Sequence, residues 1–244
     1  MRYLFIDTSH GVATALVDTA KNEVISREIS ETRSQVEHLM PLVDEVLGNQ
    51  PRPDCVIVSR GPAPFTGLRV GLVSARALGF SWDVPVLGVD ELHLQAFAAL
   101  RSLPEKDKLP RWVVSVIDAR RHEVYAAAFA ADPDLERRSE DWVGKLTDLE
   151  AQLSLQCPGF PADLETVVTV GDKAPELEWG HFVTVSPAQL ALAAGGIVSG
   201  ALGLESATTD ASQQLRALSA DELAAAGLET APAYLRRPDI HQRS

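Results

Sequence analysis

Two stretches in different halves of this chain share one pattern. Residues 5–16, FIDTSHGVATAL, and residues 116–128, VIDARRHEVYAAA, each combine an apolar strand, an aspartate, a polar turn and an Ala-rich strand. Further on, residues 87–99, LGVDELHLQAFAA, and residues 183–195, VTVSPAQLALAAG, each combine a strand, a capping residue and an apolar helix. This order predicts an α/β fold made of two related βββαβαβα subdomains, with mixed sheets covered by helices. The alternative is a generic α/β protein whose halves match by chance.

Periodicity and capping residues place the remaining elements. Ser34 and Glu37 form a capping-box pattern, Asp90 is a suitable N-cap, and Ser186-Pro187 suits the start of a helix. The predicted helices are 34–47, 66–82, 90–100 and 188–204, and the predicted strands are 3–6, 12–17, 24–28, 55–59, 84–89, 112–117, 123–129, 167–170 and 183–185.

A charged segment with two prolines, residues 101–111, suits an exposed linker between the halves. We therefore predict an N-terminal subdomain over residues 1–104 and a C-terminal subdomain over residues 112–227. Residues 228–238 are expected to join the first subdomain, and residues 239–244 to form a flexible tail.

Composition narrows the class of protein. With 244 residues, 45% of them hydrophobic, the chain can bury a substantial core. Its net charge of -12 makes it a poor stand-alone binder of nucleic acid, because Lys and Arg dominate affinity for phosphate backbones. Cys55 and Cys157 have no metal or redox spacing, the apolar run before Asp7 is too short for a signal peptide, and the Ala/Gly-rich segment 188–204 favours a buried helix over a membrane span. We expect a cytoplasmic protein that has no contact with membranes.

The duplicated unit, with an aspartate at the end of each first strand, resembles the actin, Hsp70 and sugar-kinase (ASKHA) superfamily. The resemblance implies two turns that face each other across a cleft and bind nucleotide phosphates through backbone N–H groups. The turn that contains Asp7, Thr8 and Ser9 suits this role. The turn after Asp118 has no glycine and suits phosphate binding poorly. The alternative for Asp118 is a structural role, as a strand-end residue that caps its turn.

A second candidate anion site follows the strand 55–59. The stretch 59–72, SRGPAPFTGLRVGL, opens a helix, whose N-terminus favours anions, and Arg69 on its first turn can pair with one. The structural alternative is that the prolines fix a turn and the glycines let the helix pack closely. The predicted anion or nucleotide site comprises Asp7, Thr8, Ser9, Gly61, Thr66, Gly67 and Arg69.

Within this stretch, GPAPFTGLRVGL resembles the G-P-G-S-F-T-G-L-R-I-G motif of the TsaB family, also called YeaZ and formerly classed with glycoproteases. The opening FIDTS, the helix VEHLMPLVDEVL, the segment VSVIDARRHEVYAA and the closing residues 232–236 extend the resemblance over most of the chain. The family's Gly-Ser is replaced here by Ala63-Pro64, which removes one amide donor. The resemblance implies the ASKHA fold and at most weak, vestigial nucleotide binding, with no required cofactor.

TsaB proteins are similar in fold to the catalytic paralogue TsaD, which transfers threonylcarbamoyl to adenosine 37 of tRNA. In TsaD, two histidines one helical turn apart bind the catalytic metal. Their positions correspond here to Glu91 and Gln95, and His93 stands alone between them. The resemblance therefore implies no catalytic residues and no metal site. The protein is expected to be a non-catalytic scaffold that activates TsaD.

The family resemblance also implies the partners. They are TsaD in a heterodimer, the ATPase TsaE in a ternary complex, a second copy of the chain when TsaD is absent, and tRNA through the complex alone. The predicted interface consists of residues on the helices 34–47 and 66–82, namely Val36, Leu39, Met40, Val43, Leu47, Leu72 and Arg76.

Of two enzymatic alternatives, the sequence leaves the first open and speaks against the second. An ASKHA-fold ATPase or small-molecule kinase would need an adenosine-side Gly-Gly loop, for which Gly195-Gly196 is the candidate. A metallopeptidase would need metal ligands whose spacing this sequence lacks.

Overall fold

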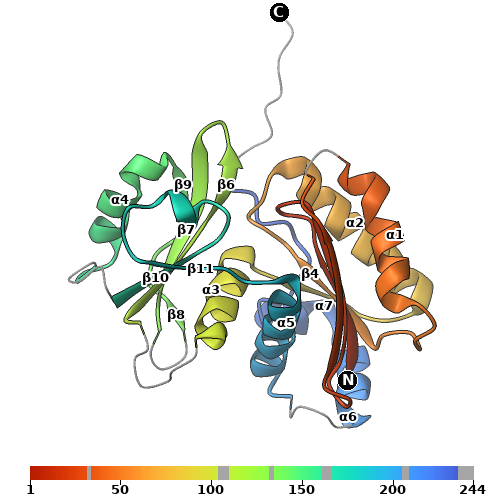
Figure 1. The fold of residues 1–244 in the computed structure, drawn as a ribbon. Coiled ribbons are helices and arrows are strands. Elements are labelled where there is room, and N and C mark those ends of the chain that lie inside the picture. Colours follow the sequence, from red (N-terminus) through yellow and green to blue (C-terminus); the bar gives the residue numbers. More distant parts are fainter. Residues whose placement is uncertain (32–33, 104–109, 132–134, 161–165, 205–208, 236–244) are drawn as a thin grey trace, which may run out of the picture.

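The structure is a computed structural model that describes residues 1–31, 34–103, 110–131, 135–160, 166–204 and 209–235. The predicted tail, residues 239–244, and most of the predicted linker lie outside these ranges. The described chain forms two units, each built around a mixed β-sheet, with helices on the outer faces and between the units (Figure 1).

The first sheet has the strand order β3-β2-β1-β4-β5. Strands β1, β2 and β3 pair antiparallel, while β4 and β5 continue the sheet parallel to β1. The strands are β1 (Arg2–Asp7), β2 (Val12–Asp18), β3 (Glu23–Ile29), β4 (Cys55–Ser59) and β5 (Val86–Val89).

The second sheet repeats this topology. Its order is β11-β10-β6-β7-β8, with β9 also paired to β7, so that β6 and β7 correspond to β1 and β2. The strands are β6 (Trp112–Arg120), β7 (Glu123–Ala130), β8 (Glu136–Arg137), β9 (Trp142–Gly144), β10 (Val167–Val170) and β11 (His181–Val183). The predicted pair of related units with mixed sheets is confirmed.

The helices form outer and inner layers. On the outer faces, α1 (Gln35–Leu47) and α2 (Phe65–Trp82) cover the first sheet, and α4 (Leu149–Gln156) covers the second. Between the sheets lie α3 (Glu91–Ser102) and α5 (Pro187–Leu202), which pack against each other (Figure 1). The remaining helices are the 3-10 turns η2 (Leu146–Asp148) and η4 (Ala174–Glu176), α6 (Thr209–Ala217) and α7 (Ala220–Ala225).

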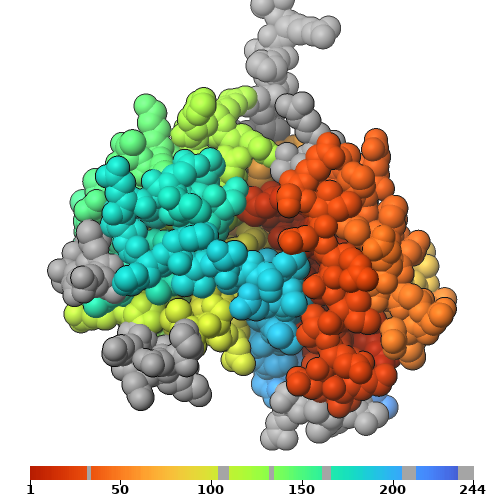
Figure 2. Space-filling view, viewed as in Figure 1, coloured from red at the N-terminus to blue at the C-terminus, as the bar shows by residue number. Residues whose placement is uncertain are grey.

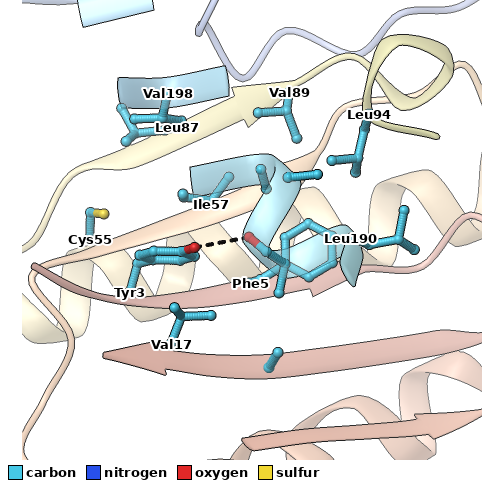
Figure 3. Packing of buried hydrophobic residues seen from close by; sticks show 14 of the residues in the cluster. Tyr3, Phe5, Val17, Cys55, Ile57, Leu87, Val89, Leu94, Leu190 and Val198 are labelled. Carbon is cyan, nitrogen blue, oxygen red and sulfur yellow. Dashed lines mark hydrogen bonds between the residues drawn. The ribbon is translucent and has the colours of Figure 1, made fainter. Parts of the chain in front are cut away.

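Each inner helix packs mainly on the sheet of the other unit. Leu92 and Ala96 of α3 are buried in one core with Phe129 of the second sheet. Conversely, α5 packs on the first sheet, where the Tyr3 hydroxyl donates a 3.0 Å hydrogen bond to the Ala191 carbonyl (Figure 3). Packing therefore crosses the predicted boundary at residue 112, and the stability of one unit depends on the other.

Packing of helix α5 accounts for the Gly-Gly pair that was the sequence candidate for an adenosine-binding loop. Gly195 and Gly196 lie inside this helix, and a Cβ on Gly195 would come within 2.2 Å of the Tyr3 hydroxyl oxygen. The glycine therefore lets the helix approach a buried tyrosine. The interpretation of Gly195-Gly196 as a nucleotide-binding loop is wrong.

The C-terminal segment returns to the first unit, as expected for the described part of residues 228–238. The Gly88 N–H donates to the Leu228 carbonyl at 2.8 Å, and the Ala233 N–H donates to the Arg60 carbonyl at 2.8 Å. Leu215 of α6, Leu223 of α7 and Leu218 between them join the core of the first sheet together with α5, although the prediction assigned residues up to 227 to the second unit. Leu235 packs against the core of the second sheet.

Candidate functional site in the cleft and on the outer helices

The turn between β1 and β2 is held rigidly by both outer helices. The Asp7 Oδ1 atom accepts a 2.8 Å hydrogen bond from the Ser9 N–H, which shapes the turn. Thr8 donates to the Gly67 carbonyl at 2.8 Å, and the Gln35 amide donates to the Thr8 carbonyl at 2.9 Å. A Cβ on Gly67 would lie 2.5 Å from the Thr8 carbonyl oxygen, so this position requires glycine. Thr8 and Gly67 are adjacent, and their contact is one of helix packing.

Arg69 does not face the cleft. Its guanidinium carbon lies 3.7 Å from the centre of the Phe65 ring, and its Nε donates to the Tyr234 hydroxyl at 3.3 Å. Thr66 is exposed on the same helix. The C-terminal segment therefore covers this end of α2, and its Tyr234 accepts a hydrogen bond from the arginine that was expected to bind an anion.

A cavity of about 240 Å³ lies between the two units, bounded by β2, β3, α5 and the loop after β10. Figure 2 shows the hollow between the first unit, in red and orange, and the second unit, in cyan. Its polar lining includes Asp7, His10, Gln95 and Asp172. Of the seven residues predicted for an anion site, Asp7 alone lines this cavity; Thr8, Ser9, Gly61 and Gly67 are buried behind it, and Thr66 and Arg69 are exposed. The structure does not assemble the predicted site.

A buried carboxyl group, which no sequence motif marks for its chemistry, lies beneath the cavity. Glu91 is fully buried and accepts hydrogen bonds from the Ser59 hydroxyl at 2.7 Å and from the Gln95 amide at 2.8 Å. Burial, together with the nearby charge of Asp7, raises the pKa of Glu91 to about 8. Glu91 and Gln95 occupy the positions that the resemblance equates with metal-binding histidines, and here they bond to each other.

A charged pair crosses the cleft above this carboxyl group. His10 Nδ1, from the first unit, lies 3.2 Å from Asp172 Oδ2, from the second unit. The other carboxylate oxygen, Oδ1, accepts a 2.9 Å hydrogen bond from the Asp118 N–H. Burial opposes the charged imidazolium, but the hydrogen bond and charge of Asp172, with the charges of Glu91 and Asp7, raise the pKa of His10 to about 9. Burial likewise opposes ionised Asp172, yet His10 holds the pKa of that carboxyl below its usual value.

The turn after Asp118 differs from the turn after Asp7 in its backbone. Arg120, Arg121 and His122 all have left-handed φ angles, of 65°, 58° and 61°, without any glycine. Their side chains are exposed, and Arg120 forms an ion pair with Asp118 at 3.2 Å. This tight hairpin presents side chains, rather than free backbone amides, toward the outside.

The outer helices carry the predicted partner interface, and the structure divides it. Val36 and Met40 on α1 are 70% and 41% exposed, as an interface requires. Leu39, Val43 and Leu72 are buried in the first unit's own core, so their assignment to a partner interface is wrong. Leu47 is partly buried against the same core, and the Arg76 guanidinium donates to the Thr230 carbonyl at 2.7 Å.

On α2 the exposed face includes Arg76, which was predicted, but not the buried Leu72. Val73 and Phe80 are 64% and 91% exposed, and neither was selected from the sequence. A signal for them exists, because Gly67, Gly71, Ala75 and Gly79 recur at helical spacing. Such a row of small residues marks the side that approaches the sheet, which leaves Val73 and Phe80 on the opposite side.

Comparison with known proteins gives the family. The chain matches the family model described as TsaD, tRNA N6-adenosine threonylcarbamoyltransferase, over residues 23–238. The chain belongs to this family. It is 32% identical over 126 residues to the tRNA threonylcarbamoyladenosine biosynthesis protein TsaB of Haemophilus influenzae, covering 50% of this chain and 51% of that protein. It is 32% identical over 104 residues to TsaB of Escherichia coli, covering 41% of this chain and 43% of that protein. The chain therefore spans about half the length of these curated relatives.

Solved structures agree on the fold. YeaZ from Pseudomonas aeruginosa superposes with a TM-score of 0.62 at 22% identity, covering 86% of this chain and 97% of that chain. A further structure, of an uncharacterized protein with similarity to peptidase YeaZ from the same organism, gives a TM-score of 0.66 at 20% identity and covers 96% and 99% of the two chains. These matches, with the family model, confirm the ASKHA fold. The sequence relatives named TsaB support the resemblance to the TsaB (YeaZ) family that the motifs predicted.

The described part of the chain contains neither a candidate metal-binding cluster nor a candidate membrane span. Within it, no three His, Cys, Asp or Glu side chains are grouped so that they could hold a metal ion. Over the same ranges, no helix is both long enough and apolar enough to cross a membrane.

Proposed function

We propose that this protein is a non-catalytic partner of TsaD in the formation of N6-threonylcarbamoyladenosine at position 37 of tRNA. It binds TsaD through the outer faces of α1 and α2 and thereby enables transfer by TsaD, while the ATPase TsaE completes the system. The observation that carries this proposal is the exposure of Val36, Met40, Val73 and Phe80 on these two helices. The names of the TsaB relatives support the same pathway.

The exposed side chains call for a protein partner. Large apolar side chains gathered on one face of a soluble protein commonly mark an interaction surface. Helices α1 and α2 pack against each other on the outside of the first sheet, so their exposed sides belong to one face of the molecule (Figure 1). The same face supports a homodimer when TsaD is absent, because a two-fold contact can pair a patch with its own copy.

The chemistry of the cleft supports a non-catalytic role. Catalysis by a TsaD-type enzyme requires two metal-binding histidines, and Glu91 and Gln95 occupy those positions here. Glu91 is fully buried and hydrogen-bonded to Gln95 and Ser59, so its oxygens are already engaged within the protein.

The charge of the chain supports binding of tRNA through the complex alone. A net charge of -12 repels phosphate backbones, so TsaD must supply most of the positive surface. The carboxylates of Asp7 and Asp172 in the cleft likewise disfavour a nucleotide triphosphate there. A cytoplasmic location, where tRNA is modified, goes with this role.

The interface is tested by charge substitution with a matched control. Val73→Arg and Met40→Arg each place an unpaired charge in the proposed interface, whereas Leu155→Arg alters an 80% exposed leucine on α4 of the other unit. Burying an unpaired arginine costs several kcal/mol, so affinity for TsaD should fall about a thousandfold in the first two variants and stay unchanged in the third. Circular dichroism checks folding, and isothermal titration calorimetry with TsaD measures binding.

Activity is tested in the same set of proteins. Purified TsaD and TsaE should form threonylcarbamoyladenosine on tRNA when the wild-type chain or Leu155→Arg is added, and should lose this activity with Val73→Arg. The chain alone should transfer nothing. Wild-type affinity in both α1 and α2 variants would place the interface elsewhere, and turnover by the isolated chain would refute the non-catalytic role.

A further inference from the structure

Among the described residues, two ion pairs connect the units beside the packing of helices α3 and α5. One is the ion pair between Arg137 of β8 and Asp90 at the start of α3, at 2.6 Å. The other is the pair of His10 and Asp172 at the cleft, at 3.2 Å. The second contact joins the turn after β1 to the loop after β10, which lie on opposite sides of the cavity.

Both members of the cleft pair are held by their own units. The turn that carries His10 is fixed because the Gln35 amide donates to the carbonyls of Thr8 and Gly11, at 2.9 and 3.3 Å. Asp172 is fixed because its Oδ1 accepts from the Asp118 N–H. Gly171 before it has a φ of 110°, and a Cβ there would lie 2.2 Å from the Val116 carbonyl oxygen. Neither member of the pair is therefore free to move within its own unit.

We propose that His10 and Asp172 form a charged clasp that holds the two units together over the cleft and opens when His10 loses its proton. The remaining ring nitrogen of His10, Nε2, is buried and has no hydrogen-bond partner among the described residues. Asp172 thus makes the largest interaction that offsets the burial of the charged ring, and the charges of Glu91 and Asp7 add to it. A neutral imidazole can still donate from Nδ1 to the Asp172 carboxylate, but it loses the attraction between two opposite charges that strengthens the bond of the protonated ring.

The groups around His10 set the direction of the pH dependence. Asp7 from β1, Glu91 from α3 and Asp172 from the second unit act on the ring, and Asp118 and Lys173 contact or neighbour Asp172. The raised pKa of His10, about 9, lies above the ordinary value of about 6.5 expected in the unfolded chain. The clasp therefore contributes fully to stability below about pH 6.5 and loses its contribution as the pH rises through about 9. On the acid side, the contribution falls as Asp172 becomes protonated.

Glu91 changes stability in the same pH range and must be separated from the clasp. Its pKa is raised to about 8. The folded protein therefore loses stability as the pH rises from the ordinary range of Glu in the unfolded chain to about 8, and this range overlaps that of His10. Glu91→Gln removes this titration. Asp90→Asn is the control, because it removes the charge of the other ion pair between the units and keeps an N-cap for α3. Since Asp and Arg ordinarily titrate outside pH 6.5 to 9.5, the effect of this variant should not depend on pH in that range.

The charge of the clasp is tested by nuclear magnetic resonance. The imidazole signals of His10 should titrate near pH 9 in the wild-type protein, and Asp172→Asn should lower that value to the ordinary histidine range or below. Titration of wild-type His10 at or below its ordinary value, or no change in Asp172→Asn, would overturn the clasp.

The mechanical role is tested by stability and by distance. Asp172→Asn should lower the free energy of unfolding at pH 6.5 and not at pH 9.5, and it should do so in both the wild-type and the Glu91→Gln backgrounds. The cost of Asp90→Asn should be equal at both pH values.

The distance across the cavity is measured with spin labels on the double variant Glu28→Cys and Pro175→Cys, because both positions flank the cavity and the native Cys55 and Cys157 are buried. The two labels should move apart when the pH is raised to 9.5. In Asp172→Asn they should be apart at both pH values. An unchanged label distance in both cases would show that the pair does not hold the cleft closed.

Discussion

The two units share a sheet topology and differ in what covers their outer faces. The first unit carries α1, of 13 residues, and α2, of 18 residues. At the same points of the topology, the second unit has α4, of 8 residues, and the 3-10 turn η4, of 3 residues. An outer layer can therefore shorten while the sheet beneath it keeps its strand order.

The shortened layer is completed by aromatic residues. Phe160 contacts Trp112 and Trp179, with ring centres 5.1 and 5.9 Å apart, and these rings close the outer core of the second unit. Rings that pack edge to face bury much surface with little chain. Because the long outer helices are confined to the first unit, that unit alone among the described parts offers a broad outer helical face to a partner.

The sharpest way to test this difference is to compare neighbours on α1. Leu39 is 1% exposed and belongs to the first unit's core, while Met40 beside it is 41% exposed. Leu39→Ala should lower the free energy of unfolding by about 2–5 kcal/mol, whereas Met40→Ala should change it by about 0.5 kcal/mol or less. Urea denaturation measures both. Equal costs would mean that α1 is rotated about its axis relative to this arrangement.

Strand patterns predicted the fold better than helix patterns predicted the interface. A strand buried on both faces, such as Cys55–Ser59, is an apolar run that leaves little choice of assignment. A helix such as α1 has apolar residues on more than one side, so Leu39 and Met40 look alike in sequence although one faces the sheet and the other faces solvent. Packing decides which side of a helix faces the sheet. Sequence spacing alone predicts that side only to within about one residue.

The inner layer gives a second comparison, because α5 belongs to the second unit by sequence and to the first by packing. Gly195→Ala would place a Cβ 2.2 Å from the hydroxyl oxygen of Tyr3, a buried ring that is held by its bond to Ala191. The crowding should cost about 1–3 kcal/mol. A Cβ on Gly200 of the same helix would meet no atom within 4 Å, so Gly200→Ala should stabilise the protein by up to about 1 kcal/mol.

Thermal unfolding of the two glycine variants checks this prediction. If both substitutions stabilise the protein equally, α5 does not press on Tyr3, and the two units would share less core than the structure indicates. A loss of stability in Gly195→Ala that is accompanied by one cooperative transition would confirm that the units unfold together.

The candidate site was only partly accessible to sequence reasoning. Asp7 was selected because it ends a strand before a polar turn, and it does line the cleft. Asp172 could not be paired with His10, because the two lie 162 positions apart in the chain and neither belongs to a local motif. Glu91 looks like an ordinary acidic residue in the first turn of a helix, and only the packing of α3 against both sheets buries it. Such residues become recognisable when the tertiary contacts are known.

The smallest expected effect compares the starts of α1 and α5, where the sequence predicted a cap at each. At α5, the Ser186 hydroxyl accepts from the Gln189 N–H and Gln189 bonds back to the Ser186 N–H, which forms a complete capping box. At α1, Ser34 makes no side-chain cap, and its buried hydroxyl has no partner among the described residues. Ser186→Ala should therefore cost about 0.5–2 kcal/mol. Ser34→Ala should be neutral or slightly stabilising, because it removes an unsatisfied polar group. Paired denaturation curves measure both changes, and a comparable loss in Ser34→Ala would show that α1 begins with the cap that its sequence predicts.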